Sequence, residues 1–280
     1  MTRWFREFLT GECEKMRKFL TLTGISIQKL MYYKTSFLLN LITPFIELAG
    51  QFLLWNALYG LQGGSPIGGM ARREMLTYIP VAFALNNLLS WTTENALSRE
   101  IRNGTVVARC IRPVSFISQA VAEMSGAAIV QGAVNFSVVA VLFAFFHKSF
   151  VFPGPGAAAV FVPCMLLSVL LRILVIEVFS LLCFFTTGHL GISWTRNALC
   201  NFFSGALIPV SLFPGWLAGL TYMTPFPYMV QIPVAVLLGR ELPAGLFWIF
   251  FLQIFWIGIF LLLHFCIFRR IRRNMNIAGG

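Results

Sequence analysis

The chain is divided by one basic stretch, which reads Ser98-Arg99-Glu100-Ile101-Arg102-Asn103-Gly104-Thr105-Val106-Val107-Ala108-Arg109-Cys110-Ile111-Arg112-Pro113-Val114-Ser115. The segments on either side of it are strongly apolar. Four arginines with a glycine and a proline cannot lie in hydrocarbon, where each guanidinium would cost several kcal/mol. The stretch is therefore predicted to be an aqueous loop at a membrane surface.

Composition sets the class of the protein. Of the 280 residues, 58% are hydrophobic and only 11% are charged, and the mean hydropathy is +0.79. Soluble domains have about a quarter of their residues charged. A chain of this length can hold about six spans of ~20 residues with their loops. The composition predicts an all-α integral membrane protein with one domain of six transmembrane helices.

The net charge of +11 does not indicate a nucleic-acid binding protein, because the basic residues are confined to the margins of apolar segments. The six cysteines occur singly, without paired spacing, so neither a disulfide framework nor a zinc site is predicted.

Residues 1–35 are predicted to form an amphipathic interfacial helix, an elbow before the membrane domain of residues 36–280. Apolar side chains between Arg3 and Leu30 recur mostly at spacings of three, four and seven. The opposite face is basic, which suits the anionic inner leaflet. A soluble helix packed on a partner is the alternative. No continuous apolar core is present, so the segment is not a cleavable signal peptide.

The apolar segments predict spans at residues 37–59, 75–95, 117–146, 157–185, 198–212 and 246–268. With both termini inside, sixteen of the 21 Lys and Arg residues lie on the cytoplasmic side. These are seven before the first span, four in the 98–115 stretch, Arg196, and four after the last span. Four lie outside and Arg172 lies within a span. The positive-inside rule therefore predicts cytoplasmic termini, in a cell membrane such as the bacterial plasma membrane.

Residues 204–240 contain repeated prolines in an apolar setting, which excludes one continuous helix. Short helices that enter the outer leaflet part of the way and return would satisfy this pattern. The segment is predicted to be re-entrant and extracellular, between the fifth and sixth spans.

Two motifs resemble the permeases of type-2 ABC (ABC-2) transporters. The first is the pattern of residues 101–105 followed by 111–115, and the second is the run of residues 204–214 followed by Pro225-Phe226. With the six-span plan, the resemblance covers nearly the whole chain.

In that family the first motif is a cytoplasmic coupling helix that docks on an ATPase, and the second is an outer gate. The resemblance therefore implies coupling residues Arg99, Glu100, Ile101, Arg102, Asn103, Gly104, Arg109, Arg112 and Pro113, and gate residues Gly205, Pro209, Phe213, Pro214, Pro225 and Phe226.

The same resemblance implies partners. These permeases pair with a second permease chain, identical or homologous, and with two copies of a separate cytoplasmic ATPase. This chain contains no Asp, no His-Glu-x-x-His motif and no Walker-type phosphate loop. We therefore expect a non-enzymatic subunit with no catalytic residue, no metal and no cofactor of its own, with ATP and Mg bound by the partner subunit.

Three charges fall inside predicted spans: Glu47, Arg172 and Glu177. Buried ions tend to pair, so Arg172 is expected to meet Glu47 or a glutamate of a neighbouring span. Whether these charges clamp helices or contact cargo stays open.

The second span becomes polar toward its end, where Asn86, Ser90 and Thr93 would share one helix face. Such side chains either bridge helices or line a path.

The function predicted from these features is the permease subunit of an ATP-driven exporter. Few polar groups could hold a hydrated solute, so the expected cargo is hydrophobic or amphipathic: a drug-like compound, a peptide or a lipid-linked molecule. The alternative is an ATP-independent protein, either a proton-coupled transporter or a membrane anchor. The two halves show no convincing internal similarity of the kind found in many secondary transporters.

Overall fold

The structure, a computed structural model, describes residues 2–32, 34–63, 65–145, 150–151, 154–186, 189–240 and 242–278. Side chains are described for all of these except 2–13, 34–44, 189 and 274–278. Over these ranges the regular structure is helical, with one isolated β-bridge between Ile67 and Met70. The prediction of an all-α membrane protein is confirmed.

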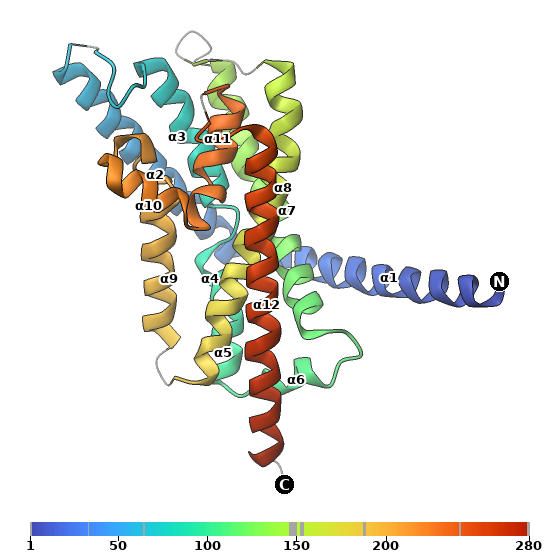
Figure 1. The fold of residues 1–280 in the computed structure, drawn as a ribbon. Helices are drawn as coiled ribbons and strands as arrows, with labels where there is room; N and C mark the ends of the chain where they lie inside the picture. The colour runs from blue at the N-terminus through green and yellow to red at the C-terminus, as the bar shows by residue number, and fades with distance from the viewer. Residues whose placement is uncertain are drawn as a thin grey trace.

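The N-terminal helix α1 (Thr2–Tyr32) projects sideways from the bundle, as Figure 1 shows. It packs along α7 (Phe116–Phe145). The two helices approach closely at Gly126, where an added Cβ would lie 2.7 Å from the Thr23 carbonyl oxygen. Ser26 donates a 2.7 Å hydrogen bond to the Glu123 carbonyl. Within the segment predicted as one helix, residues 2–32 are helical, and the C-terminal half of α1 is attached to the bundle.

After α2 (Lys34–Leu61), the predicted second span at 75–95 is not one helix. It begins with α3 (Arg72–Asn86), which is followed by a turn, α4 (Trp91–Glu94) and α5 (Ala96–Arg102). Asn87 folds its amide back on the Phe83 carbonyl at 3.2 Å, and Asn135 of α7 donates to the Asn87 carbonyl at 2.8 Å. Ser90 then caps α4 by accepting from the Thr93 amide. Side-chain hydrogen bonds to the backbone thus replace the helical ladder after Asn86.

Three helices in the described part of the chain are long and apolar enough to cross a membrane. They are α7, α8 (Pro155–Leu181) with the 3₁₀ turn η2 (Leu182–Phe184), and α12 (Leu246–Ala278). The predicted spans 117–146, 157–185 and 246–268 coincide with them. Much of the turn predicted between the third and fourth spans lies outside the described residues.

The predicted fifth span at 198–212 is misplaced. Helix α9 (His189–Phe203) begins nine residues earlier and ends before Pro209. Short helices follow: η3 (Val210–Leu212), α10 (Gly215–Tyr222), η4 (Phe226–Tyr228) and α11 (Gln231–Leu237). The expectation of short helices in residues 204–240 is correct. Pro209, Pro214 and Pro225 each stand directly before one of them, and α11 ends before Gly239, which has a φ of +63°.

The two ends of the bundle differ. Figure 1 places α10, α11 and the α2–α3 connection toward one end, and α5 and α6 (Val107–Cys110) with the C-terminal end of α12 at the other. Between them, α3, α8, α11 and α12 share one apolar core. All residues of α11 are buried, as are residues 75–85 of α3. A helix that is buried on every side shows no amphipathic pattern, which explains why α3 reads as a lipid-facing span.

Candidate functional site

The arginine segment, residues 98–115, folds as the end of α5 followed by α6. Helix α5 ends at Arg102 with Asn103 as its C-cap, and Gly104 then adopts a φ of +74°. This left-handed conformation is the usual glycine termination of a helix, and it turns the chain into the one-turn helix α6. The segment is therefore a shaped surface with two short helices.

Arg109 joins three helices at this segment. It pairs with Glu100 of α5 through both carboxylate oxygens, and its Nη2 lies 2.5 Å from Glu123 Oε2 of α7. Burial lowers the pKa of the Arg109 guanidinium, but hydrogen bonds and Coulomb attraction from the two carboxylates outweigh it and raise the pKa above its ordinary value. Arg109 therefore stays charged and ties α5 and α6 to α7.

Other side chains of the segment face outward. Val107 is 53% exposed and Ile111 is 80% exposed, so two apolar side chains lie four residues apart on its surface. Arg102 and Asn103 are exposed beside them.

The predicted coupling residues thus divide into two groups. Glu100 and Arg109 form internal ion pairs, and Arg99 donates to the Thr92 carbonyl at 2.6 Å. Arg102, Asn103, Gly104, Arg112 and Pro113 are exposed, and Ile101 is half-buried.

A second group of charges lies within the bundle, at Glu94. Arg172 of α8 contacts Glu94 Oε1 at 2.8 Å, and Arg196 of α9 contacts Glu94 Oε2 at 2.9 Å. Glu94 is 4% exposed and Arg196 is 1% exposed. Asn86 accepts from Arg172 at 3.0 Å and donates to Asn201 at 3.1 Å. We call these five residues the Glu94 cluster; it links α3 and α4 to α8 and α9.

The Glu94 cluster decides one open expectation and corrects another. Of the two partners expected for Arg172, the structure shows a glutamate of the neighbouring span, Glu94, and not Glu47, which is exposed on α2. Arg196 was expected in a cytoplasmic loop, but it is buried within α9. The cluster holds two guanidinium groups against one carboxylate, so it carries one net positive charge.

Glu177 is fully buried on α8, away from the Glu94 cluster. Its Oε1 lies 3.7 Å from Nδ1 of His264 on α12, which is beyond hydrogen-bond distance. The ring of His264 stacks on Phe268, and Phe116 lies close by. The three predicted intramembrane charges therefore have different environments: Glu47 is exposed, Arg172 is ion-paired, and Glu177 is buried.

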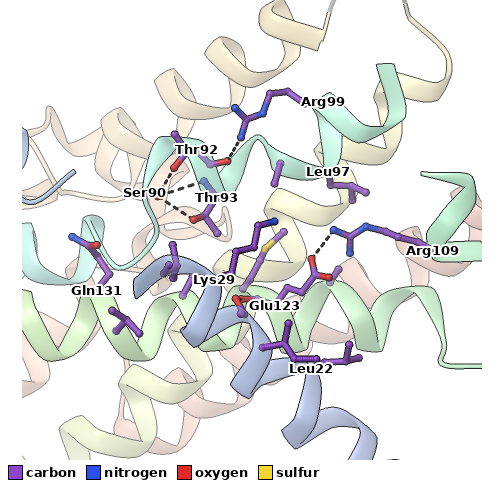
Figure 2. Close-up of a pocket in the computed structure, with 18 of the residues that line it drawn as sticks. Leu22, Lys29, Ser90, Thr92, Thr93, Leu97, Arg99, Arg109, Glu123 and Gln131 are labelled. Carbon is purple, nitrogen blue, oxygen red and sulfur yellow. Dashed lines mark hydrogen bonds and ion pairs between the residues drawn. The ribbon is translucent and has the colours of Figure 1, made fainter. Parts of the chain in front are cut away.

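A cavity of about 630 Å³ lies between α1, the α4–α5 connection and α7. Figure 2 shows Lys29 reaching from α1 toward α4, with Glu123 and Arg109 beside it. Ser90, Thr92 and Thr93 supply hydroxyl groups and are hydrogen-bonded to one another. Since α3 ends at Asn86, the three residues predicted to share a face separate: Ser90 and Thr93 line this cavity, and Asn86 belongs to the Glu94 cluster.

The predicted gate residues lie at the opposite end of the bundle. Gly205 has a φ of +80°, and the Tyr78 hydroxyl lies 2.6 Å from its carbonyl oxygen and 2.5 Å from Gln231 Oε1. Pro209 and Pro225 are buried, Pro214 is exposed, and Phe213 stacks on Phe202. Phe226 stacks on Phe203. Polar groups from α3 and α11 therefore hold the start of this segment.

Five residues of the cavity and the two ion-pair groups escaped the sequence reasoning as site residues: Lys29, Glu94, Glu123, Arg196 and Asn201. Glu123 was the most visible of them, since a lone carboxylate near the start of an apolar span requires a partner. Nothing in the sequence pairs it with Arg109. The two arginine partners of Glu94 lie 78 and 102 residues away from it, so only the fold brings them together.

Comparison with known proteins fits this arrangement. The sequence profile described as "ABC-2 family transporter protein" matches residues 45–279, which is most of the chain. No curated protein matches the chain. The matched region contains α3 to α12, and with them the arginine segment, the Glu94 cluster and the proline-rich segment. The chain belongs to the ABC-2 transporter family.

Proposed function

We propose that this chain is the permease subunit of an ATP-driven exporter, and that residues 98–115 receive force from a separate cytoplasmic ATPase. The observation that carries the proposal is the construction of the arginine segment. Exposed Val107 and Ile111 offer an apolar contact for a partner, with exposed Arg102 and Asn103 at the rim. Apolar centres with polar rims are typical of protein interfaces.

Force applied to the segment has two routes into the bundle. Arg109 ties α6 to α5 and α7 through Glu100 and Glu123. Helix α5 directly follows α4, which carries Glu94 and its ion pairs to α8 and α9. A shift of α5 and α6 would therefore move several helices as a packed two-state element, biased by the nucleotide state of the ATPase.

Six spans with both termini in the cytoplasm agree with this function. Besides the three long apolar helices, α2 has 28 residues and is about 42 Å long, more than the ~30 Å of hydrocarbon. The second crossing would consist of α3, α4 and α5 in series, and the fifth would be α9. The arginine segment and the basic end of α12 then lie on one side, as the positive-inside rule requires.

Glu47 supports pairing with a second permease chain. It is exposed on α2, within the first span, between exposed Ile46 and the glycine Gly50. A carboxylate facing lipid at that depth is costly. We therefore assign this face of α2 to the contact with a second permease chain or to the path between the two chains.

The outer end would act as the gate. Short helices α10 and α11 with η3 and η4 would form a re-entrant segment in the outer leaflet, held at Gly205 by Tyr78 and Gln231. A hydrophobic or amphipathic cargo suits a bundle whose outer segment is lined by stacked phenylalanines. The gate residues and this cargo class belong to the same proposal.

The test is co-purification from a mild detergent of the tagged permease and an ATPase. The Val107→Glu/Ile111→Glu double variant places two charges in the apolar contact, and we expect at least a tenfold loss of bound ATPase. Leu61→Glu is the matched control, because Leu61 is 85% exposed at the other end of the bundle. Equal ATPase recovery with the double variant would refute docking at this surface. Transport by the purified permease without any ATPase would refute the exporter itself.

A further inference from the structure

The cavity between α1, α4–α5 and α7 borders the coupling route at Arg109 and Glu123, and its lining is charged. Its lining includes four cationic side chains, Lys29, Arg99, Arg109 and Arg112, against the single carboxylate of Glu123. Adding Glu100, which pairs with Arg109, still leaves a net charge of +2. The volume of about 630 Å³ is within the range of small-molecule sites.

The positive charges are not equally available. Arg109 is saturated by two carboxylates, and Arg112 lies 3.9 Å from Glu123 Oε1. Within the described part of the chain, the Arg99 guanidinium makes one hydrogen bond, to the Thr92 carbonyl, and it has further N–H donors. Lys29 makes no ion pair with any residue whose side chain is described. Lys29 and Arg99 therefore line the cavity with N–H donors that a ligand could use. The hydroxyls of Ser90, Thr92 and Thr93 lie beside them.

The remaining wall is apolar. Leu22, Ile25 and Leu30 of α1 face Ala127 and Val130 of α7 across it. A site with cationic and hydroxyl donors on one side and aliphatic side chains on the other fits an amphiphile with an anionic head. A free anion would leave the aliphatic wall without a partner.

We propose that this cavity binds an acidic phospholipid of the inner leaflet, with its phosphate at Lys29 and Arg99 and an acyl chain along α1 and α7. The inference rests on the proposed function in one respect: it needs the arginine segment to face the cytoplasm. The lipid would stay bound to the permease, between α1 and the two helices of the arginine segment, α5 and α6. Its headgroup would bridge α1 to α5, two helices that the cavity otherwise separates.

The experiment measures lipid retention by the purified permease alone, so that it is independent of the ATPase test. Delipidated protein is titrated with dioleoyl-phosphatidylglycerol or with dioleoyl-phosphatidylcholine in detergent micelles, and bound lipid is counted by native mass spectrometry. We expect one phosphatidylglycerol to bind at least tenfold more tightly than phosphatidylcholine. The double substitution Lys29→Gln/Arg99→Gln should lower the affinity for phosphatidylglycerol by about tenfold or more, since each cation beside an anionic headgroup contributes to the binding free energy.

The matched control is Arg17→Gln/Lys18→Gln, which removes two charges from the same helix outside the cavity. It should change the affinity less than twofold. A second variant, Ile25→Trp, narrows the cavity from an exposed position without changing its charge, and it should also reduce retention. Equal binding of phosphatidylcholine, an equal loss in the control, or no loss in either cavity variant would overturn the proposal. Full displacement of the lipid by inorganic phosphate would instead show a site for soluble anions, which also overturns it.

Discussion

Glu94 is the residue that holds the Glu94 cluster together, because it is the ion-pair partner of two guanidinium groups in the bundle. Removing one partner of a buried ion pair typically costs about 3–5 kcal/mol, since the other charge stays buried without compensation. Here one substitution would strand two arginines, Arg172 and Arg196.

Glu94→Gln is therefore expected to destabilise the permease by at least about 3 kcal/mol, seen as a lower thermal unfolding temperature in detergent. Glu47→Gln is the control, because Glu47 is exposed in the single chain and should melt close to the unaltered protein. If both variants melt alike, the Glu94 cluster does not hold the bundle together.

The residues of the Glu94 cluster show how much of the site could be predicted from the sequence. A lone arginine in an apolar segment requires a counter-charge, so the need for a partner of Arg172 was predictable. Its identity was not, because Glu94 looks like the polar end of a span and becomes buried only when α3 stops at Asn86. Arg196 was predicted to lie in a loop because the fifth span was expected to begin at residue 198. In the structure α9 begins at His189, and its position in the fold buries Arg196.

At the scale of the elements, the contact between α1 and α7 tolerates little added volume at Gly126. Gly126 faces the backbone of α1, and an added Cβ would lie 2.7 Å from the Thr23 carbonyl oxygen and 2.9 Å from the Ser26 Cβ. Neither helix has a flexible side chain there that could move aside. Overpacking of this kind costs about 1–3 kcal/mol.

Gly126→Ala is expected to loosen α1 from the bundle and to speed its proteolytic removal severalfold, while the remaining helices stay protected. Gly24→Ala on α1 itself is the control, since a Cβ there meets nothing within 4 Å and alanine favours a helix. Equal cleavage rates for the two variants would mean that α1 does not depend on this close approach.

Elements were predicted best where a span is long and uniformly apolar. Helices α7, α8 and α12 follow the expected ranges closely, because they are long and apolar, and hydroxyls within them such as Ser168 bond to the carbonyl four residues earlier without ending the helix. The predictions of the second and fifth spans were wrong where the helix ends early. Asn87 and Ser90 bond to the backbone after α3, and α9 ends at Phe203, just before Gly205 with its φ of +80°. The coupling segment was predicted as a surface loop, but its internal ion pair to Glu123 was not.

At the scale of the whole molecule, the proposed topology assigns opposite sides of the membrane to two exposed sites. Cys110 is exposed in the arginine segment, and Gln62 is exposed in the turn after α2, at the other end of the bundle. The side of the membrane on which each site lies can be determined by labelling a single cysteine, Cys110 itself or a cysteine that replaces Gln62.

With Cys110 as the only cysteine, a membrane-impermeant maleimide is expected to label inside-out vesicles and not intact cells. With Gln62→Cys as the only cysteine, the labelling should be reversed. Labelling of both sites from the same side would exclude the six-span arrangement with an inner arginine segment. A denatured sample, in which both variants react, controls for thiol reactivity.

The Glu94 cluster also has a consequence for the biogenesis of the protein. Glu94 is synthesised 78 residues before Arg172 and 102 residues before Arg196. At about 5–20 residues per second, a ribosome needs roughly 4–16 s to cover the first of these separations. During that time an unpaired carboxylate is unfavourable in the bilayer, so in the proposed topology the α4–α5 part of the second crossing would stay at the aqueous surface. The central helix α3 can therefore complete its packing only after α8 and α9 have entered the membrane, which makes the core of this permease one of the last parts to assemble.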